Sequence, residues 1–128
     1  MSCQNLVSGE LTDEQLRASL EAVKALDKSL DFLISLSPDA RKHMIKLRAD
    51  HVDFVHQMKS VCNQQPDFLP RQFELAEFDL DVALSSQLEQ LETAISNFAR
   101  RVEDTMMGVR SDMYAGALEA YNYLRIAK

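Results

Sequence analysis

The stretch Leu84–Leu124, LSSQLEQLETAISNFARRVEDTMMGVRSDMYAGALEAYNYL, decides the fold of this 128-residue chain. Apolar side chains recur in it at steps of three or four residues, which is the spacing of one face of an α-helix. This apolar stripe consists of Leu84, Leu88, Leu91, Ile95, Phe98, Val102, Met106, Val109, Met113, Ala117, Ala120 and Leu124. The pattern predicts one long amphipathic helix.

The composition of the whole chain favours an all-α fold. Glycine and proline, the residues that β-rich domains need at their many turns, each occur only three times. Good helix formers such as Ala, Leu, Glu, Gln and Lys are abundant. We therefore predict a single helical-bundle domain over residues 1–128, with a flexible leader at 1–10 and a loop at 63–70.

Two further helices are expected before the stripe. The first begins after Thr12, which with Gln15 can form a capping box, and should end near Leu36. The second begins at Pro38, directly after the capping residue Ser37, and its apolar positions continue to Cys62. The short connection predicts that these two helices form an antiparallel hairpin.

The third helix contains Gly108, and this residue leaves two folds open. If the helix runs on from about residue 76 to 126, continuous or kinked at Gly108, the fold is an antiparallel bundle of three long helices. A turn at residues 105–112 would instead give an up-down four-helix bundle. The stripe keeps its phase through Gly108, and a glycine inside a helix costs only roughly 1 kcal/mol relative to alanine. We therefore favour the three-helix form.

A continuous third helix of roughly 75 Å would extend beyond helices half as long. Its end would then expose an apolar surface that a second copy can cover through a two-fold interface. The predicted interface residues are Met113, Tyr114, Ala117, Tyr121 and Leu124. In the four-helix form, the tyrosines would lie at the rim of a monomeric core instead.

The charge of the chain excludes some partners. The net charge is −6, which argues against nucleic-acid binding. Basic side chains dominate residues 38–62 and acidic ones residues 67–107, so the two segments can lie side by side, or the acidic one can attract a basic partner. Neither a signal peptide nor a membrane span is predicted, and the two cysteines form no disulfide pattern, so we expect a cytoplasmic protein with no membrane contact.

Several short motifs resemble those of a group of bacterial helical-bundle proteins to which no activity is assigned. They are Phe32–Pro38 (FLISLSP), Phe54-Val55, Gln64–Pro66, Asp104–Met106 and the stretch from Tyr114 to Tyr121. The resemblance extends over residues 30–124 and implies a helical protein without transferring any site. This chain stops at Lys128, sooner after the tyrosines than those proteins do.

The sequence contains no constellation typical of catalysis. Glycine loops for phosphates, a nucleophile elbow and Glu-x-x-His metal motifs are absent, so we predict no enzyme activity, no cofactor and no metal site. His51 stands in an apolar stripe and is predicted to be a buried polar position. The first hypothesis is a non-enzymatic interaction protein that forms a homodimer and can bind another protein. The alternative is a small-molecule- or metal-binding bundle that uses His51 with Met44 and Met58.

Overall fold

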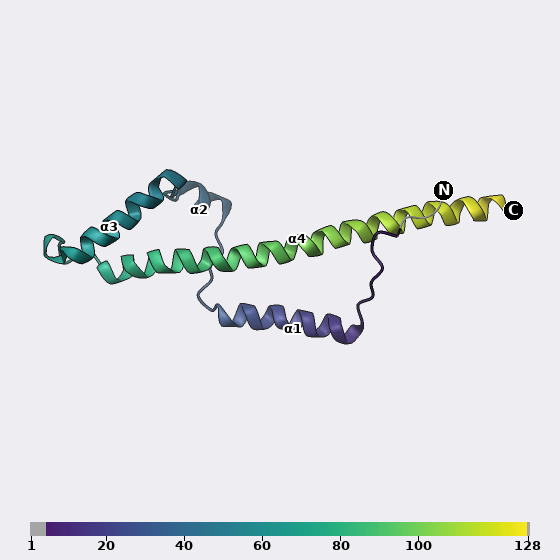
Figure 1. Cartoon of the computed structure of the whole chain (residues 1–128), viewed down its shortest axis with the longest axis horizontal. Helices are drawn as coiled ribbons and strands as arrows, with labels where there is room; N and C mark the ends of the chain where they lie inside the picture. The colour runs from purple at the N-terminus through teal and green to yellow at the C-terminus, as the bar shows by residue number, and fades with distance from the viewer. Residues whose placement is uncertain (1–4, 128) are drawn as a thin grey trace. The chain divides into compact units, whose positions relative to one another are not determined.

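The stripe lies on one continuous helix, α4, which spans Leu75–Ile126 in a computed structural model that describes residues 5–127 (Figure 1). The prediction of a third helix that runs through Gly108 is confirmed, and the four-helix alternative, which needs a turn there, is wrong. Its 52 residues make α4 about 78 Å long. The described residues form helices and connections but no strand, so the fold is all-α.

Helix α1, Asp13–Ser29, begins as its sequence predicts. The Thr12 hydroxyl accepts the N–H of Gln15 and the Gln15 side chain accepts the N–H of Thr12, both at 3.0 Å. The helix ends at Ser29 rather than near Leu36, so the predicted end is wrong. A helix gains most of its stability from tertiary packing. The apolar face of α1 stays largely exposed, from Leu26 at 39% to Val23 at 64%, so little packing stabilises further turns.

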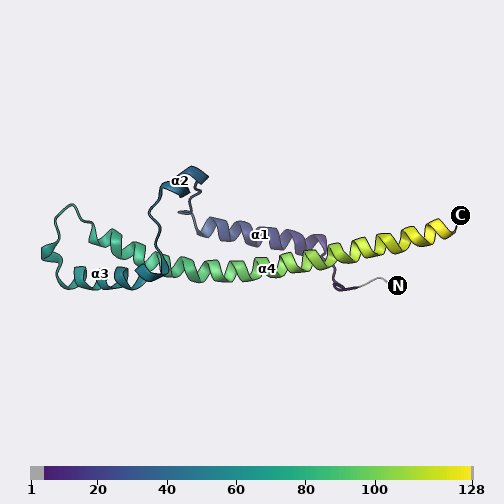
Figure 2. The same cartoon turned by 90° about the horizontal axis from the view of Figure 1, so that it is seen from above.

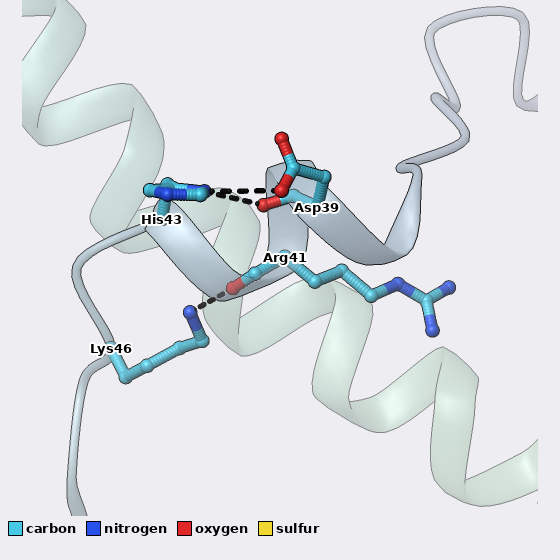
Figure 3. Close-up of polar contacts among 4 residues, drawn as sticks. All are labelled: Asp39, Arg41, His43 and Lys46. Atoms are coloured by element: carbon cyan, nitrogen blue, oxygen red, sulfur yellow. Dashed lines mark hydrogen bonds and ion pairs between the residues drawn. The ribbon is translucent and has the colours of Figure 1, made fainter.

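The helix predicted from Pro38 to Cys62 is divided into two. Helix α2 covers Pro38–His43, the 3₁₀ turn η1 covers Ala49–His51, and helix α3 covers Val52–Gln64. The Lys46 ammonium donates to the carbonyl of Arg41, which the N–H of residue 45 would occupy in a continuous helix (Figure 3). It also donates to the carbonyl of Met44 at 2.8 Å. A side chain thus takes the place of the next helical turn.

The chain divides into two units, one formed by Met1–Ser37 with Arg100–Lys128 and the other by Pro38–Ala99. In the second unit the chain turns after α3 through the 3₁₀ turn η2, Pro66–Phe68, and enters α4, which makes a helical hairpin (Figure 2). The Asn63 amide donates to the Asp79 carboxylate at 3.0 Å and joins the two helices of this hairpin. The rings of Phe73 and Phe78 pack edge to face near its turn, with ring centroids 5.9 Å apart.

Neither unit closes a hydrophobic core, because none of the described residues is buried. The chain exposes 11885 Å². Two separate globular bodies of half its 14.5 kDa mass would together expose roughly 8300 Å². The excess surface is apolar in large part, since Leu, Val, Ile, Phe and Met side chains are exposed on every helix longer than ten residues. The three-helix bundle predicted from the sequence therefore remains a prediction.

Candidate protein interface

The C-terminal half of α4 carries all five predicted interface residues, and all five are exposed. Met113, Tyr121 and Leu124 expose 65%, 61% and 71% of their surface. Tyr114 is exposed to a similar extent, and Ala117 lies between these side chains. The helix therefore presents a continuous apolar face over about three turns, larger than single apolar residues scattered on a surface.

The tyrosines at the end of α4 have different neighbours. The guanidinium of Arg125 lies 6.0 Å from the ring centroid of Tyr121, which is within the range of a cation–π contact. The hydroxyl of Tyr123 reaches Glu119 at 3.5 Å. Because residues two apart lie about 200° apart around a helix, Tyr123 projects from a different side of α4 than Tyr121. Of Tyr121 and Tyr123, only Tyr121 belongs to the predicted interface.

An N-terminal clasp holds residues 6 and 7 against another side of α4. The backbone N–H groups of Leu6 and Val7 each donate to the Asp112 carboxylate, one to either oxygen, at 3.0 Å. A carboxylate that accepts two N–H groups forms charge-assisted bonds, which are stronger than those between neutral groups. Residues 1–4 of the predicted leader lie outside the described residues, whereas residues 6 and 7 are tied to the helix.

Gly108 explains why the clasp can form at this place. A Cβ atom at this position would lie 2.9 Å from Cγ2 of Val7, closer than real Cβ contacts. No described glycine has a positive φ, so Gly108 serves close approach and not a turn. Gly108 and Asp112 are four residues apart and share one side of the helix. Sequence reasoning missed this contact, although a glycine inside an unbroken helical pattern was a signal for it.

The clasp leaves the apolar stripe open. Val109 and Met113 directly follow Gly108 and Asp112 in the sequence. Their side chains therefore project from α4 about 100° around the helix axis from the side that the clasp contacts. Val109 is 38% and Met113 65% exposed. Leu6 and Val7 thus lie against a neighbouring side of α4 rather than against the predicted interface.

The structure places His51 at the end of η1, directly before α3, where it is half-buried. Its Nε2 lies 3.4 Å from Nη2 of Arg48. Met44 lies in the non-helical connection before η1, while Met58 belongs to α3. Within the described part of the chain, no three His, Cys, Asp or Glu side chains gather closely enough to hold a metal ion.

Comparison of the chain with protein-family models, with curated proteins and with solved structures finds no match. Over residues 5–127, no helix combines the length and apolarity needed to cross a membrane. The interpretation of the interface therefore rests on the residues and their geometry.

Proposed function

We propose that this protein works by protein–protein association, first with a second copy of itself, through the C-terminal half of α4. The observation that carries the proposal is the exposed apolar stripe, with Met113, Tyr121 and Leu124 all more than half exposed. Tyrosine, methionine and leucine together supply the apolar area and polar tips that are common at interfaces. The proposed interface also contains Tyr114 and Ala117.

The lengths of the helices indicate that a second copy, rather than α1 and α3 of the same chain, covers the whole stripe. The stripe from Leu84 to Leu124 is about 60 Å long, whereas the 17 residues of α1 and the 13 of α3 reach about 25 and 20 Å. Both helices laid end to end would leave a quarter of the stripe open. A second copy supplies the missing cover, and the predicted antiparallel three-helix bundle would then close only in the assembly.

We further propose that the association takes place in the cytoplasm and that the protein has no catalytic role. Neither nucleic acid nor a membrane is a proposed partner. The resemblance to bacterial helical-bundle proteins without an assigned activity is in keeping with a role in assembly rather than chemistry. A homodimer is the simplest closed arrangement, because a two-fold axis lets each stripe cover the other.

The test compares two tyrosine variants by sedimentation or light scattering. Tyr121→Asp places a charge in the interface and should weaken self-association by at least ~2 kcal/mol, or roughly thirtyfold. Tyr123→Asp is the matched control, because the Tyr123 side chain is similarly exposed, at 67%, but projects from another side of α4. Equal effects of the two variants, or none, would overturn the proposal. Circular dichroism should show full helicity in both.

A further inference from the structure

The second unit carries two exposed surfaces of opposite charge that do not satisfy one another. The first is the basic connector, Arg41–Arg48, which contains Arg41, Lys42, Lys46 and Arg48 and no acidic residue. The second is the acidic hollow, a shallow depression on α4. It is lined by Asp81, Leu84, Ser85, Leu88, Glu89 and Glu92.

The sequence suggested that these oppositely charged segments lie side by side and pair within the chain. The ion pairs found over residues 5–127 are instead local to short segments, since they join Lys24 to Glu21, His43 to Asp39 and Arg48 to Asp50. The Arg41 side chain extends away from its neighbours in α2 (Figure 3). Over residues 5–127, Arg41, Lys42 and the three carboxylates of the acidic hollow form no ion pair, whereas Lys46 and Arg48 make local contacts. Arg41, Lys42 and the carboxylates thus remain available for a partner of opposite charge.

Both surfaces also carry apolar groups, which indicates a protein partner rather than a purely ionic one. Ile45, in the middle of the basic connector, is 100% exposed, and Met44 beside it is 48% exposed. Leu84 and Leu88 form the floor of the acidic hollow between its carboxylates. The two surfaces match in length as well. The non-helical residues 44–48 reach at most about 16 Å, and the helix rises about 16 Å from Asp81 to Glu92.

We infer that the basic connector of one copy docks in the acidic hollow of a second copy, with Ile45 against Leu84 and Leu88. In a two-fold dimer this contact forms twice, because each copy presents both surfaces. The inference rests on the proposed self-association and adds a second, charged contact to it.

The experiment is a charge exchange between two variant proteins. Variant B carries Arg41→Glu and Lys42→Glu, and variant A carries Asp81→Lys, Glu89→Lys and Glu92→Lys. Each variant alone has surfaces of like charge, so its dissociation constant should rise at least about tenfold in low salt. An equimolar mixture should associate as A–B pairs within about threefold of the wild-type affinity. The substitution of Arg17, Lys24 and Lys28 by Glu in α1 is the matched control and should change the affinity less than threefold.

The outcomes separate this inference from the proposed function. If B alone associates as well as the α1 control, or if the A–B mixture stays dissociated, the docked connector is wrong, whatever Tyr121→Asp does. If B dissociates and the mixture recovers while Tyr121→Asp has no effect, the charged contact stands and the stripe interface falls. Binding of the wild type, but not of B, to phosphatidylserine vesicles or DNA in place of self-association would also overturn the inference, because the connector would then serve an anionic surface.

Discussion

The two halves of α4 carry the same apolar stripe but differ in what covers it. In the first half, Leu84, Leu88 and Leu91 are half-buried in the unit that contains the α3–α4 hairpin. In the second half, Met113 and Leu124 are 65% and 71% exposed, although the N-terminal clasp lies on the adjacent side of the helix. Helical phase alone therefore does not decide burial. Burial depends on whether another segment lies against that side of the helix.

The largest expected effect comes from placing a charge in each half of the stripe in turn. Leu88→Asp puts a carboxylate at the position of a half-buried leucine, so the free energy of unfolding should fall by about 2 kcal/mol. Met113→Asp should lower it by less than about 0.5 kcal/mol in the dissociated chain while abolishing self-association. Urea unfolding at low and high protein concentration measures both quantities. If Leu88→Asp and Met113→Asp lowered the free energy of unfolding equally in dilute solution, the two halves of the stripe would not differ in burial.

A smaller effect is expected when the clasp loses its carboxylate. Asp112→Ala removes both acceptors of the Leu6 and Val7 N–H groups, which should cost about 1 kcal/mol of local stability. Hydrogen exchange resolved by residue should show these two amides losing their protection while the amides of α4 keep theirs. Asp104→Ala, at an exposed position of the same helix, is the control. Slow exchange at Leu6 and Val7 in Asp112→Ala would contradict the clasp.

The smallest and most specific effect is expected at Gly108. Gly108→Ala should strengthen α4 by up to ~1 kcal/mol through helix propensity. The added methyl group would meet Cγ2 of Val7 at 2.9 Å, so the clasp must shift or open. We expect slower amide exchange in α4 and faster exchange at Val7 in the same sample. If Gly108→Ala slowed amide exchange both in α4 and at Val7, Val7 would not lie over the glycine.

Local rules in the sequence predicted the parts of the fold that local interactions determine. The capping box of Thr12 and Gln15, the helix start at Pro38 and the unbroken phase through Gly108 all lie within a few residues of their cause. The predicted end of the first helix near Leu36 and the unbroken helix from Pro38 to Cys62 were wrong, because both predictions assumed that an apolar face always finds cover. Leu33, Ile34 and Ile45 are exposed, and the chain around them is not helical.

The exposure of the five proposed interface residues could be predicted from the stripe, because a helix longer than its neighbours leaves its end uncovered. The clasp was missed, since it joins residues more than one hundred positions apart through backbone N–H groups, and only Gly108 marks its place in the sequence. The position of His51 depended on a helix that the connector interrupts. Its half-burial at the start of α3 is a consequence of that interruption.

The most direct test of the central claim, that the open stripe of α4 is an assembly surface, is the mass of the wild-type protein in solution. Size-exclusion chromatography with light scattering, run over a dilution series through the micromolar range, measures it without a label or variant. We expect twice the 14.5 kDa of a single chain at the higher concentrations, with dissociation on dilution. A mass of one chain at every concentration would contradict the account.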